Sequence, residues 1–313
     1  MQSYHDRLLQ RALRAFGDLP PSEAIAKTRA ITGPGGIPAS EALAVSAMKK
    51  LRHFIAPTQE EVLALEYVIR IMRPAPLTRD GLLDPLDDGA GDVHPPATVG
   101  RWNTFRVNVQ SILRSVGRID HLQLGHMGTG FLIGPGLLAT NAHVLTFLTQ
   151  GTGILAPGSA RVRFNCELGA QEPAPTRASI LGVAAVHPEL DIALLQIEEN
   201  ADRVSLSLDL DTQVEEGHPI VVVGYPAESS ASNPLFQEAI FKGKFGVRRG
   251  ALGEVLSAQA PVLHHDCTTL GGNSGSPIFS LQSEKVIGIH SSGTFTYRND
   301  GVTAREIDKA RPR

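Results

Sequence analysis

Short apolar runs separated by Gly, Pro and Asn turns recur from about residue 118 onward, and they limit the folds open to this chain. In chain order they cover residues 118–122, 130–133, 137–139, 162–164, 192–197, 220–223, 253–256, 277–279 and 285–290. Many short strands at such a rhythm are typical of an all-β sandwich or barrel. With 42% hydrophobic and 19% charged residues the composition is that of an ordinary globular protein.

One glycine-rich stretch near the C-terminus has the pattern of a nucleophile turn. It reads Gly271-Gly272-Asn273-Ser274-Gly275-Ser276-Pro277. Glycines on both sides leave space around the Ser274 hydroxyl for an incoming carbonyl group. In such a turn the N–H groups of Gly272 and Ser274 converge where the oxyanion of a tetrahedral intermediate would lie. The alternative for this stretch taken alone is a surface Gly/Ser/Asn loop.

Two further motifs accompany the serine. Thr140-Asn141-Ala142-His143-Val144 and Asp191-Ile192-Ala193-Leu194-Leu195 place a histidine and then an aspartate before it. With these three motifs, over roughly residues 115–305, the chain resembles the trypsin-like (chymotrypsin-fold) serine peptidases, especially the bacterial ones. The order His, Asp, Ser differs from that of α/β-hydrolases and of subtilisins. The resemblance implies two six-stranded antiparallel β-barrels with the active site in the cleft between them.

The chemistry assigns one role to each residue of the motifs. Ser274 needs a base within hydrogen-bond reach, and a histidine has the suitable pKa. His143 is the candidate among eleven histidines, because it follows the apolar stretch 130–142 as the family's base does. Asp191 would orient the imidazole and stabilise the imidazolium. The pair His264 and His265 is the main rival, and we interpret it as structural because it lies on the strand that enters the serine loop.

The residues before Ser274 bear on substrate preference. By the resemblance, Thr268 stands at the base of the primary pocket, where a trypsin-type enzyme carries an Asp, so cleavage after Arg or Lys is not expected. Thr269 and His290 match the Thr and His that line the pocket of the glutamyl-endopeptidase branch. Their donors, with a protonated His290, would suit a carboxylate side chain. Small or medium neutral side chains are the main alternative.

A second departure from the digestive members concerns activation. Those enzymes carry Asp directly before the nucleophile, paired with a buried N-terminal amine, whereas this chain has Asn273. An amide carries no charge to stabilise an ammonium, so we do not expect that activation switch here.

Charge and composition exclude several function classes. The net charge of −3 gives no overall basic balance for nucleic acid or an anionic membrane surface. No run of 18 apolar residues is present, the first residues are charged where a signal peptide is apolar, and there are only two cysteines, Cys166 and Cys267. We therefore expect a cytoplasmic protein with free thiols. No metal-ligand or nucleotide-binding spacing occurs, so neither metal nor cofactor is expected.

The N-terminal third has a different character from the rest. Residues 1–75 show apolar stripes at helical spacing, with a Thr58-Gln59-Glu60-Glu61 capping box before the last stripe, and predict a small all-α domain. Residues 76–100, rich in Pro, Gly and Asp (including Asp84, Asp87 and Asp88), predict an extended linker. Residues 101–313 are then the peptidase domain, opening with a helix over 102–116.

Two functions remain open at this stage. The favoured one is an intracellular serine endopeptidase that acts on proteins or peptides, with residues 1–75 serving regulation, recruitment of a protein partner or self-association. Alternatively, residues 1–100 could act as an inhibitory segment or a propeptide. The rival function is a catalytically silent peptide-binding or scaffold protein on the same fold.

Overall fold

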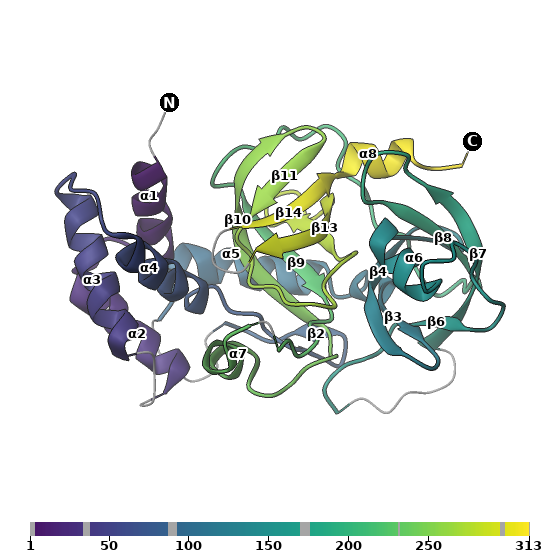
Figure 1. Ribbon diagram of the computed structural model, residues 1–313, viewed down its shortest axis with the longest axis horizontal. Coiled ribbons are helices and arrows are strands. Elements are labelled where there is room, and N and C mark those ends of the chain that lie inside the picture. Colours follow the sequence, from purple (N-terminus) through teal and green to yellow (C-terminus); the bar gives the residue numbers. More distant parts are fainter. Residues whose placement is uncertain are drawn as a thin grey trace.

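Two closed antiparallel β-barrels of six strands each form the body of the protein, and a bundle of helices lies at one end (Figure 1). The structure is a computed structural model that describes residues 4–33, 38–86, 93–169, 176–230, 232–294 and 298–312. The fold class expected from the sequence, two six-stranded barrels preceded by a small helical region, is confirmed.

The first barrel has the strand order β3-β4-β5-β8-β7-β6. Its interior is apolar, and Ile119, Leu132 and Leu138 are among its buried side chains. The strands of the first barrel are β3 (Val116–His121), β4 (Gly125–Gly134), β5 (Leu137–Thr140), β6 (Ala160–Arg163), β7 (Arg177–Val186) and β8 (Ala193–Ile197).

The second barrel has the order β10-β11-β14-β13-β12-β9. Val222, Leu263 and Ile278 lie in its core. Each apolar run expected to be a strand overlaps a strand of one of the two barrels. The strands of the second barrel are β9 (Pro219–Gly224), β10 (Arg249–Gln259), β11 (Val262–His265), β12 (Pro277–Ser280), β13 (Val286–Thr294) and β14 (Arg298–Thr303).

Helix α5 (Pro96–Asn108) packs its aromatic side chains into the core shared by the barrels. Trp102 and Phe105 are fully buried, and the Phe105 ring lies 5.8 Å from the ring of Phe279 on β12. The helix expected over 102–116 is wrong in its bounds. Proline at the first helical position starts the helix at residue 96, and a 3₁₀ turn (Leu113–Ser115) leads into β3.

The N-terminal helices form a bundle with its own apolar core, which we call the helical module. Leu8, Met48 and Leu65 are buried in that core. Thr58 and Glu61 form the expected capping box at the start of the last helix. The helices of the module are α1 (Tyr4–Phe16), α2 (Pro21–Thr32), α3 (Pro38–Arg52) and α4 (Gln59–Ile71).

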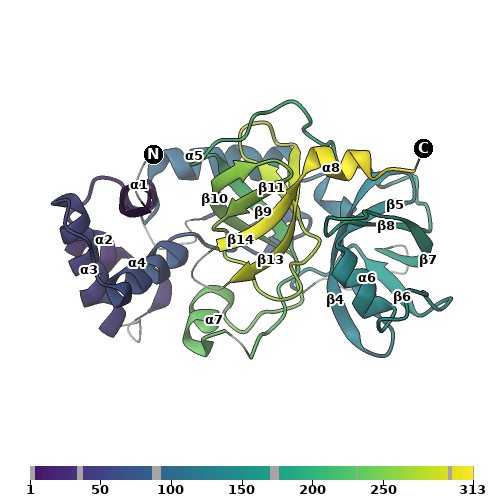
Figure 2. The same cartoon turned by 45° about the horizontal axis from the view of Figure 1, so that its top comes forward.

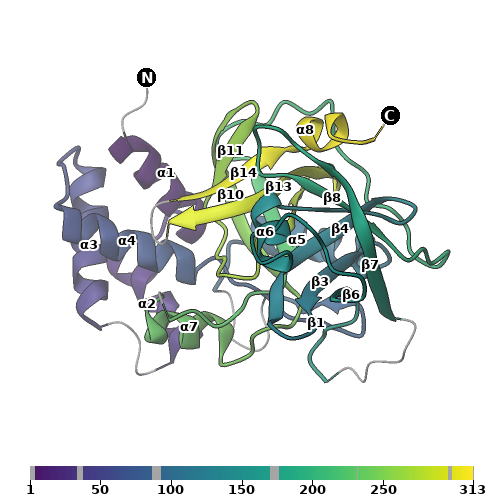
Figure 3. The same cartoon turned by 45° about the vertical axis from the view of Figure 1, so that its right-hand side comes forward.

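The helical module contacts the second barrel and lies on its far side from the first barrel, as Figures 2 and 3 show from two further directions. Ile71 and Ala75 at the end of α4 are buried in the core of the second barrel. Helix α7 (Pro234–Phe241), which follows β9, contacts α2 and α4. Helix α8 (Ala304–Lys309) follows β14.

Residues 76–86 differ from the extended linker expected from their composition. They form the small hairpin β1 (Thr78–Arg79) and β2 (Leu82–Leu83), and Leu83 is fully buried. The N–H of Gly250 on β10 donates to the Pro76 carbonyl at 3.0 Å. Pairing with β10 supplies partners that a free linker would take from water. Asp87 and Asp88 lie outside the described residues.

No helix in the described ranges combines the length and the apolar character that a membrane crossing needs.

Candidate active site

His143 and Asp191 are brought together by the first barrel. His143 is the second residue of the short helix α6 (Ala142–Leu148), which follows β5, and Asp191 lies just before β8. The imidazole Nδ1 lies 2.7 Å from Asp191 Oδ2, and the His143 N–H donates to Asp191 Oδ1 at 3.0 Å. Because an ionised carboxylate only accepts hydrogen bonds, Nδ1 carries the proton. The lone pair of Nε2 is then available as a base.

Ser274 lies in the loop between β11 and β12, on the second barrel. Two glycines close to it adopt conformations that favour glycine: φ is +85° at Gly272 and +86° at Gly275. A Cβ at Gly275 would lie 2.1 Å from the Thr129 carbonyl oxygen, and one at Gly272 would lie 2.5 Å from the Tyr225 carbonyl oxygen. The glycines predicted around the nucleophile are therefore required by close packing as well as by φ.

Two carbonyl groups, each fixed by a hydrogen bond, orient the N–H groups predicted for the oxyanion hole. The Gly271 carbonyl accepts from Ala227 N–H at 2.6 Å, and the Asn273 carbonyl accepts from Ser276 N–H at 2.9 Å. In a trans peptide the N–H points opposite to the carbonyl, so the N–H groups of Gly272 and Ser274 point away from these partners. Neither donates to an acceptor in the described part of the chain. They are free to bind an oxyanion.

Thr129 on β4 fastens the serine loop to the first barrel, and sequence reasoning missed it. Its N–H donates to the Ser274 carbonyl at 2.8 Å, and its hydroxyl donates to the Gly272 carbonyl at 2.7 Å. The Tyr225 N–H in turn donates to the Thr129 hydroxyl at 3.2 Å. Its partners lie far away in the chain, so no local sequence pattern could have identified it. These bonds set the position of Ser274 relative to His143, which belongs to the other barrel.

The Ser274 hydroxyl donates to the Ser291 carbonyl of β13 at 3.2 Å. Within the described ranges no hydrogen bond joins it to His143. Catalytic hydrogen bonds are often formed only in the complex with substrate, and rotation about χ1 is enough to redirect a serine hydroxyl. In this conformation the predicted triad is assembled only in part, because the His143–Asp191 pair is formed and the Ser274–His143 contact is not.

His290 and His265 are hydrogen-bonded to each other inside the second barrel. Cys267 N–H donates to His265 Nδ1 at 3.2 Å, so His265 carries its proton on Nε2 and donates it to His290 Nδ1 at 3.1 Å. His290 is therefore protonated on Nε2. Burial and the nearby His143 lower the pKa of His290 to about 4, and burial together with His290 lowers that of His265. At neutral pH His290 is thus a neutral group whose Nε2–H is a donor, contrary to the protonated His290 that the sequence led us to expect.

The two threonines expected in the pocket have different surroundings. The Thr269 hydroxyl donates to Asn299 Oδ1 at 3.1 Å, and Asn299 Nδ2 donates to the Cys267 carbonyl at 2.7 Å. Thr268 is buried, and its hydroxyl lies 3.3 and 3.2 Å from the carbonyl oxygens of Arg70 and Arg73 at the end of α4. This differs from the expectation that Thr268 faces a substrate side chain, because the docked helix supplies its partners. Asn299, on β14, was not singled out from the sequence.

The rival pair has other roles. His264 Nδ1 lies 2.7 Å from Asp300 Oδ1 of the adjacent strand β14. Both histidines lie on β11, as expected, and His265 donates a hydrogen bond to His290.

A shallow groove of about 440 Å³ adjoins His143 on the first barrel. Leu124, Met127 and Phe147 give it an apolar lining, and the side chains of Leu124 and Phe147 are about half exposed. The Phe147 ring meets the His143 ring edge to face at 5.6 Å. The groove therefore reaches His143 through Phe147. Among the residues that the structure describes, no group of three or more His, Cys, Asp or Glu side chains is arranged to hold a metal ion.

Comparison with known proteins adds a family to this geometry. The family described as trypsin-like peptidase domain matches residues 128–289, about half of the chain. A probable serine protease of Lysobacter enzymogenes is 26% identical over 257 residues, which is 68% of this chain and 64% of that protein. A glutamyl endopeptidase of Staphylococcus epidermidis is 26% identical over 190 residues, covering 57% of this chain and 58% of that protein. The crystal structure of Deg5 covers 66% of this chain and 92% of its own, with a TM-score of 0.48 and 20% identity. The chain thus spans less than two thirds of the length of these sequence relatives.

Proposed function

Because the chain belongs to the trypsin-like peptidase family, we propose that it is a serine endopeptidase in which Ser274 is the nucleophile, His143 the general base and Asp191 the orienting carboxylate. One observation carries this proposal. The 2.7 Å contact between His143 Nδ1 and Asp191 leaves Nε2 as the free base, in a protein whose Ser274 loop also offers two unused N–H groups.

The proposed reaction follows from these positions. The Ser274 hydroxyl turns from the Ser291 carbonyl, gives its proton to His143 Nε2 and attacks the peptide carbonyl carbon. The electron pair of the carbonyl double bond moves to oxygen, where the N–H groups of Gly272 and Ser274 stabilise it. When the C–N bond breaks, the proton on His143 goes to the leaving amine. Water, deprotonated by the same His143, then attacks the acyl carbon; the bond between that carbon and Ser274 Oγ breaks, and the proton on His143 returns to the Ser274 oxygen.

The substrate is proposed to be a protein or peptide with a hydrogen-bond acceptor in the side chain before the scissile bond. His290 Nε2–H supports this, because the relay from Cys267 and His265 fixes it as a donor without any charge. A glutamate carboxylate would suit that donor. The name of the Staphylococcus epidermidis relative, a glutamyl endopeptidase, points to the same side chain. A small neutral side chain is the alternative. Profiling a peptide library by mass spectrometry tests the choice, and cleavage mainly after Arg or Lys would contradict it.

We further propose that the enzyme works in the cytoplasm and that the helical module regulates it or recruits a partner, another copy of the chain included. Two buried free cysteines, Cys166 and Cys267, support a reducing compartment. The contacts of the module with the second barrel support regulation through the substrate pocket.

A catalytically silent peptide-binding protein is the second candidate, favoured by one observation: the Ser274 hydroxyl is hydrogen-bonded to Ser291 and not to His143. A fluorophosphonate probe separates the two candidates. The endopeptidase predicts labelling of the wild type at Ser274, none of Ser274→Ala, and very slow labelling of His143→Ala. Absence of labelling in a folded wild-type protein would contradict the proposed function.

A further inference from the structure

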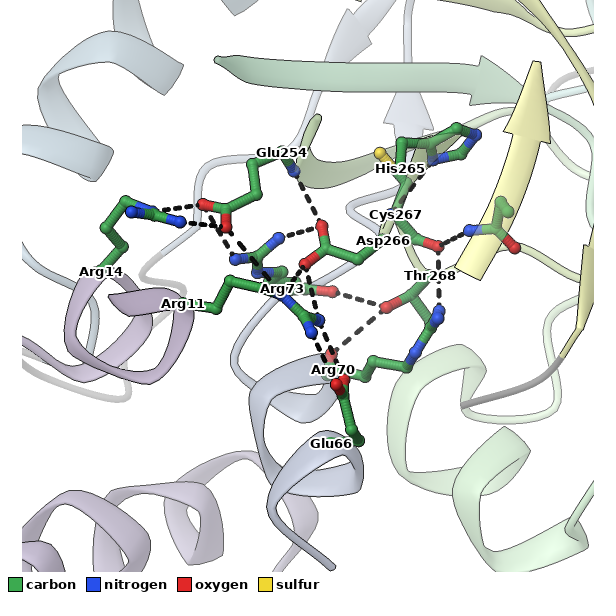
Figure 4. A network of polar contacts seen from close by, with 11 residues as sticks. Arg11, Arg14, Glu66, Arg70, Arg73, Glu254, His265, Asp266, Cys267 and Thr268 are labelled. Atoms are coloured by element: carbon green, nitrogen blue, oxygen red, sulfur yellow. Dashed lines mark hydrogen bonds and ion pairs between the residues drawn. The ribbon is translucent and has the colours of Figure 1, made fainter. Parts of the chain in front are cut away.

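The helical module meets the second barrel through a cluster of buried charged side chains, which we call the junction network (Figure 4). Four of its members come from the module and two from the barrel. They are Arg11, Glu66, Arg70 and Arg73 of the module and Glu254 and Asp266 of the barrel. Asp266 directly precedes the Cys267-Thr268-Thr269 segment that leads to the active-site loop.

Asp266 is held by Arg11 of α1 and by Arg73, which lies just after α4. Arg11 Nε donates to its Oδ2 at 3.0 Å, and Arg73 Nη1 donates to its Oδ1 (Figure 4). Arg11 also makes two hydrogen bonds to Glu66, of 2.6 and 2.9 Å, and Arg73 lies 3.2 Å from Glu254. Burial alone would raise the pKa of Asp266, but Arg73 and Arg11 outweigh it and lower that pKa to about 2. The pairs with Asp266 and Glu254 join the module to the barrel, in addition to its apolar contacts.

Arg70 does not share in this pairing. Its side chain is fully buried, yet it makes no ion pair within the described ranges, and its Nε and Nη2 have no hydrogen-bond partner there. Burial lowers its pKa. The charges of Asp266 and Glu66 raise that pKa, but burial outweighs them. A buried cation that makes no ion pair costs folding free energy, so stability alone does not explain this side chain. Its one hydrogen bond runs from Nη1 to the Cys267 carbonyl, at 3.2 Å.

That carbonyl is the start of a path into the pocket. Cys267 O also accepts from Asn299 Nδ2 at 2.7 Å, and Asn299 Oδ1 accepts from the Thr269 hydroxyl at 3.1 Å. Since a carbonyl only accepts, the contact with Cys267 O fixes which way the Asn299 amide faces, and this in turn fixes the Thr269 hydroxyl as a donor to it. Moving Cys267 O would disturb each group along the path.

A second path leaves the same residue on its other side. Cys267 N–H donates to His265, and His265 sets the tautomer of His290. The next residue, Thr268, is held by the Arg70 and Arg73 carbonyls at the end of α4. Three consecutive residues, 266 to 268, are therefore fixed by the helical module.

We propose that Arg70 is a positioning residue for substrate recognition: from α4 it holds the Cys267 carbonyl and thereby aligns Thr269, Asn299 and His290 toward the substrate side chain. The inference rests on the proposed peptidase function, whose specificity groups these are. It gives the helical module a part in selecting substrate, although Arg70 touches none.

The test separates positioning from stability. Arg70→Met keeps much of the volume and removes a buried charge that makes no ion pair and whose burial cost exceeds the attraction of Asp266 and Glu66, so the melting temperature should hold or rise. KM should rise about tenfold for the best peptide of the library. For a matched peptide with Gly before the scissile bond, KM should change less than threefold, so selectivity between the two peptides falls. Fluorophosphonate, which has no side chain for this pocket, should label the variant within threefold of the wild-type rate.

Two further variants complete the design. Thr268→Val removes the hydroxyl that contacts α4 while keeping the shape, and should shift selectivity in the same direction by a smaller factor. Arg29→Met makes the same chemical change on the exposed face of α2, where Arg29 pairs with Glu41, and should leave both peptides unaffected.

The outcomes are distinguishable. Loss of selectivity in Arg70→Met with labelling retained supports the inference; if that variant fails to fold, the same pattern in Thr268→Val supports it. Wild-type selectivity in the folded variants overturns it, and so does an equal loss on both peptides and on labelling, which marks a general structural effect. A folded wild type that is neither labelled nor active refutes the proposed function itself, and the inference falls with it.

Discussion

Replacing Asp266 by Asn removes the negative charge on which Arg11 and Arg73 converge, with almost no change of shape. The pKa of this carboxyl lies at about 2, against an ordinary value of 3.8. A difference of that size corresponds to roughly 2 kcal/mol of stability at pH 7, since each pKa unit is worth about 1.4 kcal/mol. Two buried guanidinium groups are also left short of counter-charge, and breaking a buried pair from one side costs roughly 3–5 kcal/mol. We expect a loss of about 3 kcal/mol.

Urea unfolding at several pH values measures this loss and checks its cause. Because the folded-state pKa is lowered, the stabilisation is present above pH 4, falls by about half near pH 3 and disappears below pH 2. The gap between wild type and Asp266→Asn should narrow in that window. Asp84→Asn makes the same change at a partly exposed pair with Arg79 and should cost less than about 1 kcal/mol. Equal stability of Asp266→Asn and wild type at pH 7, or a gap that does not narrow on acidification, would refute the reasoning.

Three further predictions concern the serine loop. Ser274→Ala should lower kcat/KM by several orders of magnitude, roughly 10⁴-fold or more, with an unchanged circular dichroism spectrum; full activity would exclude Ser274 as the nucleophile. Gly275→Ala should cost well over 1 kcal/mol in urea unfolding, because its Cβ would meet the Thr129 carbonyl, whereas Gly158→Ala, also at positive φ (+69°) but in open space, should cost about 1 kcal/mol; equal losses would show that packing is unimportant there. Thr129→Val should lower kcat about tenfold with little change of KM, since it frees the Gly272 carbonyl and disorders the oxyanion hole; steady-state kinetics with an unchanged kcat would speak against that role.

The barrel strands were predictable where most of their side chains are buried, because such strands appear in the sequence as runs of apolar residues. In β5 and β9 most side chains are buried, and runs such as 220–223 mark them clearly. By contrast β14 (Arg298–Thr303) reads Arg-Asn-Asp-Gly-Val-Thr and has no apolar signal, because its neighbours β11 and β13 supply the pairing that makes it a strand. Along β7 buried and exposed side chains alternate only in part, and small residues weaken the pattern further. Tertiary context, and not propensity, decides such strands.

The candidate site divides in the same way. The three predicted triad residues, His143, Asp191 and Ser274, lie in short sequence motifs, so the neighbouring residues identify them. Thr129 and Asn299 act through hydrogen bonds to residues 143 and 32 positions away, respectively, and nothing local distinguishes them from other polar residues. The altered surroundings of Thr268 have the same origin, because its partners lie on α4, nearly two hundred residues earlier.

The chemistry of the junction also bears on what the helical module is for. An apolar interface would hold the module with less demand on its orientation, whereas hydrogen-bonded buried charges lose free energy as soon as donors and acceptors move out of line. The module has an apolar core of its own, so the charges that cross to the barrel are not needed to keep its helices together. What they fix is the angle at which α4 presents Arg70 and two backbone carbonyls to the segment before the active-site loop. If the proposed peptidase is supported in this way, we expect that a partner tilting α4 would alter the pocket without contact at the proposed triad.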